Sequence, residues 1–284
     1  MFCAASQISG PGQPSHRSGQ ETVHKPKNYS QKSLMPHRHL IAANWKMNGL
    51  KDRVPVARAI AEGSRGLRAR VALFPPATLL PILADALEGT GVILGGQDCH
   101  HADSGPFTGD ISAAMLKDAG AQMVILGHSE RRHGHLEPCA LVARKASAAL
   151  RAGLEPIICI GETLDQRQQG LTRQVLTRQL TDSLPDTLKG ARFHVSYEPV
   201  WAIGTGLIAT DTQILEAFAL IRDFLNKRFK GDHEPQLLYG GSVKASNAEA
   251  LLALEGVSGA LVGGASLTPE DFLPIVRAAE TAPV

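Results

Sequence analysis

Three side chains that can move protons or stabilise charge each follow a short apolar run. They are Lys46, His128 and Glu198, and the runs before them are residues 40–45, 123–126 and 193–197. A carboxylate can take up a proton, an imidazole can donate to a carbonyl, and an ammonium group can stabilise developing negative charge. Together these side chains would suit proton transfer beside a carbonyl group.

Each of these residues also has an ordinary explanation. Lys46 could be a surface lysine whose stem lies along apolar side chains, and His128 could be a structural or surface histidine. Glu198 could cap the next helix, but Asp211 lies directly at the start of the next amphipathic segment. Because an N-cap precedes its helix directly, Asp211 is the better N-cap candidate.

Short apolar runs alternate with amphipathic segments from His39 onward, which predicts eight βα units. The apolar runs are residues 40–45, 71–74, 92–95, 123–126, 156–160, 193–197, 236–239 and 259–262. The helical patterns lie near residues 52–65, 78–88, 111–119, 138–151, 163–183, 211–229, 245–253 and 269–279. This order predicts an α/β fold in which eight parallel strands, ringed by helices, close into a (β/α)8 barrel. A doubly wound open sheet is the alternative, but no GxGxxG turn follows the first run.

Two glycine-rich turns follow the last two predicted strands. One contains Gly240, Gly241 and Ser242, and the other contains Gly263 and Gly264. Paired glycines let main-chain N–H groups approach an anion without interference from a Cβ, and this fold commonly holds phosphate after strands seven and eight. The turns therefore predict a site for a small phosphorylated ligand.

The run YEPVWAIGTG at residues 197–206 resembles the active-site signature of the triosephosphate isomerase family, and AANWKMNG at residues 42–49 matches another motif of that family. The resemblance extends over about residues 39–279. It implies that Glu198 is the catalytic base and that His128 polarises the carbonyl as a neutral imidazole. It also implies that Lys46 and Asn44 bind the substrate and stabilise an enediolate.

The same resemblance assigns the phosphate to main-chain groups at Gly204, Ser242, Gly263 and Gly264. It further implies a lid that closes over the substrate and excludes water. The predicted lid consists of Pro199, Val200, Trp201, Ala202, Ile203, Gly204, Thr205 and Gly206. Proline fixes its first residue, whereas the glycines give freedom to its far end.

A long polar loop at residues 97–110 resembles the family segment that inserts into a partner subunit, so the resemblance implies a homodimer with Phe107, Thr108 and Gly109 in the dimer loop. Asp110 stands where the family pattern has glutamate. His135 and Leu136 depart from that pattern as well, which leaves the local packing at the dimer edge open.

The implied function is that of an isomerase of glycolysis and gluconeogenesis, which interconverts dihydroxyacetone phosphate and D-glyceraldehyde 3-phosphate without a cofactor or metal. Another sugar-phosphate isomerase or aldolase is an alternative, although a Schiff-base aldolase needs a lysine in a late strand and strands six to eight contain none. A non-catalytic scaffold is a second alternative. It would gain nothing from keeping Lys46, His128 and Glu198.

Composition separates the N-terminal part from the barrel. The 284 residues carry a net charge of +2, whereas residues 1–34 carry four basic side chains against one acidic one, so the remainder carries −1. The nearly neutral remainder excludes a broad nucleic-acid surface, and nothing approaches a transmembrane run. The composition of residues 1–38 predicts a disordered extension, and Met35 is an alternative start of the protein. Residues 39–284 are predicted to form a single catalytic domain. Four widely spaced cysteines without a CxxC pair are typical of a cytoplasmic protein.

Overall fold

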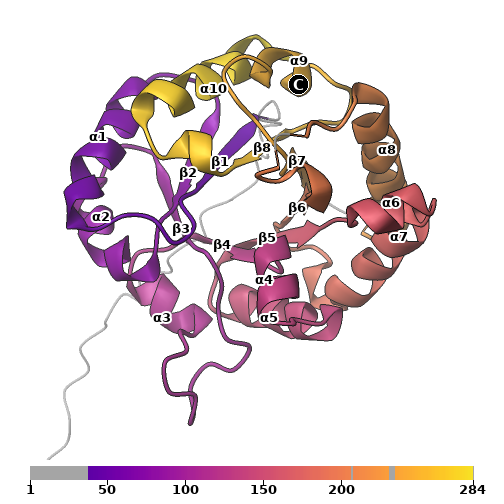
Figure 1. Cartoon of the computed structure of the whole chain (residues 1–284). Coiled ribbons are helices and arrows are strands. Elements are labelled where there is room, and N and C mark those ends of the chain that lie inside the picture. The colour runs from indigo at the N-terminus through magenta and orange to yellow at the C-terminus, as the bar shows by residue number, and fades with distance from the viewer. Residues whose placement is uncertain (1–37, 206, 230–233, 284) are drawn as a thin grey trace, which may run out of the picture. The chain divides into compact units, whose positions relative to one another are not determined.

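Eight parallel strands form a closed barrel in the computed structural model, which describes residues 38–205, 207–229 and 234–283 (Figure 1). Each strand pairs with the next, and β8 pairs with β1 to close the barrel. The strands are β1 (Leu40–Asn44), β2 (Arg70–Phe74), β3 (Ile93–Gly96), β4 (Met123–Leu126), β5 (Glu155–Ile160), β6 (His194–Tyr197), β7 (Gln236–Tyr239) and β8 (Gly259–Val262). The predicted barrel is therefore confirmed.

Helices surround the barrel and cover the outer face of the strands (Figure 1). The α-helices are α1 (Val54–Gly63), α2 (Leu80–Ala86), α3 (Ala113–Asp118), α4 (Ser129–Gly134), α5 (Cys139–Arg151), α6 (Leu164–Gln168), α7 (Thr172–Ser183), α8 (Asp211–Arg228), α9 (Ala248–Leu252) and α10 (Pro269–Thr281). Short 3-10 helices are η1 (Lys51–Arg53), η2 (Ala77–Leu79), η3 (Asp186–Leu188), η4 (Val200–Ala202) and η5 (Gly264–Ser266).

Alternate residues of each strand face two different parts of the core, as the period of a β-strand requires. In β1, Leu40 and Ala42 belong to the cluster inside the barrel, whereas Ile41 and Ala43 pack between barrel and helices. Both faces are apolar because helices cover the outside of the sheet. A fully buried leucine or isoleucine contributes about 1.5–3 kcal/mol, so both layers stabilise the barrel.

The helices differ from the sequence-based expectation at three points. The region expected as one helix at 163–183 forms α6 and α7, with Gly170 between them at φ +71°. The expected N-cap of α8 was wrong, because Thr210 caps that helix and Asp211 is its first residue. The one-turn helix α4 after β4 has no apolar periodicity of its own, so the hydrophobic pattern did not predict it.

A buried polar cluster occupies the end of the barrel where the strands begin. Arg70 of β2 pairs with both oxygens of Glu155 of β5, and Nη2 lies 3.1 Å from Oε2. His194 of β6 contacts the same carboxylate through Nε2. Burial raises the pKa of Glu155, but hydrogen bonds and charges from His194 and Arg70 outweigh it and lower the pKa to about 2.

Glu155→Gln is expected to reduce the free energy of unfolding by about 3 kcal/mol at pH 7, because a buried ion pair would lose one partner. The folded-state pKa of Glu155 lies below its unfolded value near 4.5, so its stabilisation is complete above that value and is lost as the pH falls toward about 2. Urea unfolding at several pH values should show the wild type and variant converging in acid. Glu249→Gln at an exposed site of α9 is the control, and equal stability of Glu155→Gln and wild type at pH 7 would contradict the assignment.

Some sequence-based expectations lie outside the described residues. These include the disordered extension up to residue 37, the alternative start at Met35, and Gly206 of the predicted lid. Within the described ranges, no helix is long and apolar enough to cross a membrane.

Candidate active site

The C-terminal ends of the strands gather the predicted site residues around one cavity of about 220 Å³. Because all eight strands run parallel, their C-terminal ends meet at one mouth of the barrel. The cavity is lined by residues that follow β1, β4, β6, β7 and β8, among them Asn44, Lys46, His128, Gly204, Ser242, Gly263 and Gly264. Glu198 lies beside this cavity and lines a second one, described below.

Glu198 follows β6 and is only 1% exposed. Its Oε2 accepts a hydrogen bond from the main-chain N–H of Ser129 at 2.9 Å. The other oxygen, Oε1, has no hydrogen-bond partner among the described residues and lies 3.4 Å from Nε2 of His128. A buried carboxylate with one unsatisfied oxygen is suited to take up a proton from a ligand placed next to it.

His128 is the N-cap of α4, and its tautomer follows from its hydrogen bonds. Nδ1 accepts from the main-chain N–H of Glu130 at 3.2 Å, so the proton of a neutral ring resides on Nε2. That nitrogen is the one directed toward Glu198, and its N–H can donate to a carbonyl oxygen bound in the cavity that His128 lines. The ring of His128 therefore lies at the N-terminus of a short helix.

Lys46 has a left-handed backbone conformation, with φ +52°, which is uncommon for a residue other than glycine. Its main-chain N–H donates to Oδ1 of Asn44 at 3.0 Å, and its main-chain oxygen accepts from the amide of Gln97 at 2.8 Å. The ammonium Nζ lies 2.5 Å from Oε1 of Glu130. These contacts hold a positive charge at the cavity, while Lys46 remains 27% exposed.

The lid segment begins with η4, which packs on a fully buried carboxylate. Oε1 of Glu162 accepts from the indole of Trp201 at 3.2 Å, from Tyr197 at 3.0 Å and from Arg167 at 2.8 Å. Glu162 thus holds Arg167, whereas Thr163 caps α6.

At the other end of the lid, Gly204 adopts φ +69°, where a side chain would be strained. Gly204 and Ile203 both line the small cavity.

The glycine-rich turn after β7 makes room for a functional side chain. A Cβ on Gly240 would lie 2.7 Å from Cγ of Glu198, which is too close, whereas a Cβ on Gly263 would make only an ordinary contact with Cε of Lys46 at 3.4 Å. Sequence reasoning assigned such glycines to phosphate binding and missed this packing role. It also missed Gln97, because nothing in the sequence shows that its amide reaches the main chain of Lys46.

The predicted dimer loop lies away from this cavity and extends beyond the ring of helices next to α3 (Figure 1). Phe107, Thr108 and Gly109 are all exposed in this loop. The ring of His100 lies 4.0 Å from that of Phe107, so the loop has some internal packing. Among the described residues, no group of three or more His, Cys, Asp or Glu side chains is arranged to hold a metal ion.

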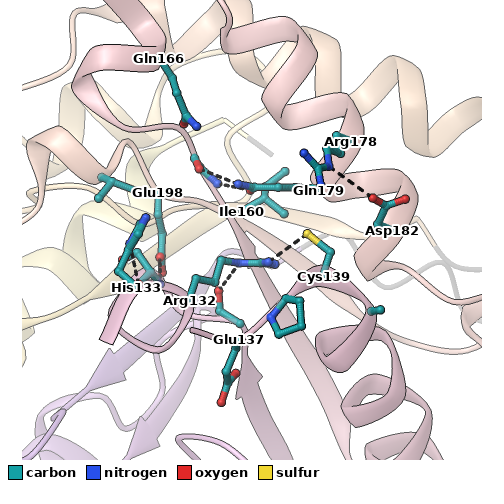
Figure 2. A pocket seen from close by; sticks show the side chains of 16 residues that line it. Arg132, His133, Glu137, Cys139, Ile160, Gln166, Arg178, Gln179, Asp182 and Glu198 are labelled. Atoms are coloured by element: carbon teal, nitrogen blue, oxygen red, sulfur yellow. Dashed lines mark hydrogen bonds and ion pairs between the residues drawn. The ribbon is translucent and has the colours of Figure 1, made fainter. Parts of the chain in front are cut away.

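A second cavity, of about 500 Å³, lies between α4, α5 and α7 (Figure 2). Glu198 and Val200 border it on the lid side. Arg132 crosses its floor, donating to the main-chain oxygens of Gly127 and Cys159. The base and the first turn of the lid therefore lie next to open space on one side.

Comparison with known proteins gives consistent matches over the barrel. A family model described as triosephosphate isomerase matches residues 39–279. Curated proteins named triosephosphate isomerase from Caulobacter vibrioides and Ruegeria pomeroyi are each 53% identical, over 85% and 86% of this chain and 96% and 98% of their own. The crystal structure of triosephosphate isomerase from Bartonella henselae is 48% identical, with a TM-score of 0.79, over 85% of this chain and 98% of that one.

Proposed function

Because the chain belongs to the triosephosphate isomerase family and interconverts dihydroxyacetone phosphate and D-glyceraldehyde 3-phosphate, we propose that Glu198, His128 and Lys46 carry out this reaction. The observation that carries the proposal is Oε1 of buried Glu198, which has no hydrogen-bond partner among the described residues and lies 3.4 Å from Nε2 of His128. A carbonyl compound bound against both atoms would meet a proton acceptor at one and a hydrogen-bond donor at the other.

In the proposed reaction, Glu198 removes the proton from the carbon next to the carbonyl of dihydroxyacetone phosphate. The electrons of that C–H bond form the enediolate, and Glu198 returns the proton to the neighbouring carbon. The Nε2–H of His128 donates to the oxygen that gains charge and moves a proton between the two oxygens. Lys46 stabilises the negative charge, and Asn44 holds the main chain of Lys46 in place.

The phosphate site is proposed at the main chain of Gly204, Ser242, Gly263 and Gly264, all of which line the small cavity. Support comes from the ammonium group of Lys46, because this residue lines the same cavity as the glycine-rich turns. We propose that residues 199–206 close over this cavity, which excludes water and strengthens the electrostatic contacts inside. Closure would also have to bring Glu198 away from Ser129 and toward the substrate.

The experiment that tests the function is conversion of D-glyceraldehyde 3-phosphate to dihydroxyacetone phosphate by the purified full chain. We expect fast conversion without added metal or cofactor. Tight binding of inorganic phosphate with no turnover by a well-folded protein would instead support a scaffold.

We also propose a homodimer formed through the loop at residues 97–110. Its support is a set of large apolar side chains that remain exposed in segments following β1, β3 and β4. These side chains are Met47, which is 96% exposed, Leu50, Phe107, Ile111, Met115 and Leu136. We propose that the partner subunit covers these side chains, because large apolar surface left exposed often marks a protein–protein interface.

Thr108→Arg is expected to convert the dimer to a monomer, because a charged side chain would be buried at the interface without a partner. We expect turnover to fall about 100-fold as the loops around Lys46 lose their support, since small displacements at a site have effects of this size. Sedimentation and kinetics on the same sample would measure both effects. Thr177→Arg, at an exposed site of α7, is the matched control, and an active monomeric wild type would contradict the dimer proposal.

We propose further that residues 39–284 are the catalytic domain and that the enzyme works in the cytoplasm, with Met35 as the start of the mature chain. The family model begins at residue 39, which supports the domain boundary. Mass spectrometry of the native protein tests the start, and peptides from residues 1–34 would exclude Met35.

A further inference from the structure

Gln179 of α7 makes two hydrogen bonds to the main chain of a single residue. Its Nε2 donates to the oxygen of Gly161 at 2.9 Å, and its Oε1 accepts from the N–H of Gly161 at 2.7 Å. Figure 2 shows this side chain reaching from its helix to the main chain beyond Ile160. The amide thus fixes the segment that follows β5 from outside the barrel.

The segment that follows β5, at Ile160 and Gly161, contacts the main chain of Glu198. The N–H of Glu198 donates to the oxygen of Ile160 at 2.7 Å. A Cβ on Gly161 would lie 1.6 Å from the main-chain oxygen of Glu198, so the two backbones are in direct contact. Any displacement of Gly161 would therefore move Glu198.

We propose that Gln179 is a positioning residue for Glu198, acting through Gly161. The proposal rests on the assignment of Glu198 as the base. The primary amide of glutamine can both donate and accept, and Gly161 offers one main-chain acceptor and one main-chain donor. A side chain that could only donate or only accept would leave one of these buried peptide groups without a hydrogen bond.

The neighbouring cavity explains why the two hydrogen bonds from Gln179 to Gly161 matter for the position of Glu198. Gln179, Gly161 and Glu198 all line the 500 Å³ space between α4, α5 and α7. Because that side of Gly161 is open, close packing does not hold it there, and the amide supplies the restraint. Loss of the amide would let the segment move toward the open space and take the carboxylate with it.

The first test compares Gln179→Met with Gln174→Met, which changes an exposed glutamine on the same helix. We expect Gln179→Met to lower kcat at least about tenfold, because reacting groups are sensitive to displacements below 1 Å. Inhibition by inorganic phosphate should stay within about twofold, because the phosphate turns lie elsewhere. A kcat within about twofold of wild type would overturn the proposal, and so would equal losses in kcat and phosphate binding.

The second test uses Gln179→Glu, whose ionised carboxylate cannot donate to the oxygen of Gly161. The protonated carboxyl restores one donor and one acceptor. The ratio of variant to wild-type kcat should therefore rise as the pH falls from about 9 to about 5. A purely structural role predicts a flat ratio, and a flat ratio would overturn the proposal.

These outcomes separate the inference from the assignment on which it rests. If Glu198→Gln keeps its turnover, the assignment of the base is wrong whatever Gln179 does. If Glu198→Gln is inactive while Gln179→Met retains wild-type kcat, only the positioning role is wrong.

Discussion

Glu198→Gln is expected to fold like the wild type and to lose at least about 10³-fold in kcat, within the range that general acid–base groups contribute. Glutamine keeps the size of the side chain, and its amide oxygen can still accept from the N–H of Ser129. What disappears is the capacity of the second oxygen to take up a proton. Because the group is 1% exposed, solvent cannot easily replace it as the base.

Two measurements test whether Glu198 is the base. Steady-state turnover gives the loss in rate, and NMR in deuterated water shows whether substrate hydrogen still exchanges with solvent. Glu216→Gln, at an exposed site of α8, should match the wild type in both. Exchange at the wild-type rate in Glu198→Gln would mean that another group is the base.

Lys46→Met is expected to lower kcat/KM by about 10²- to 10³-fold, because it removes the positive charge beside the developing enediolate. Methionine keeps most of the length of the side chain. The partner left behind, Glu130, is 55% exposed and can be solvated, so the fold should survive. The kcat should fall and the KM should rise, since the ammonium group would contact the substrate before and during proton transfer.

Lys51→Met provides the matched control, because this exposed lysine of η1 lies only five residues along the chain. It should keep wild-type kinetics. Circular dichroism of both variants checks the fold. A Lys46→Met enzyme with kcat/KM within about threefold of wild type would exclude the electrostatic role.

The sequence predicted the strands well because most are short, largely apolar runs that are buried on both faces and bounded by polar turns. For β4, β7 and β8 the predicted and observed bounds coincide, β3 is shifted by one residue at both ends, and the other four strands differ by one residue at one end. Helix details were harder. The start of α8 at Asp211 depends on which side chain caps the helix, and both Thr210 and Asp211 are good capping residues.

Within the candidate site, the residues at the strand ends could be predicted, but the side chains that hold them in place could not. Lys46, His128 and Glu198 each follow a predicted strand, so the barrel alone collects them at one mouth. Gln97 and Gln179 act through amides that reach main-chain groups of residues distant in sequence. Such contacts have no local pattern, because they depend on how loops and helices meet in three dimensions.

The pairing of β1 with β8 has a consequence for synthesis of the chain on the ribosome. Residues 40–43 make their second set of strand contacts with residues 259–262, so the barrel cannot close until almost the whole chain has been made. Until then β1 and β7 present open edges that can pair with other chains. The nascent protein therefore keeps two open strand edges until its last strand emerges.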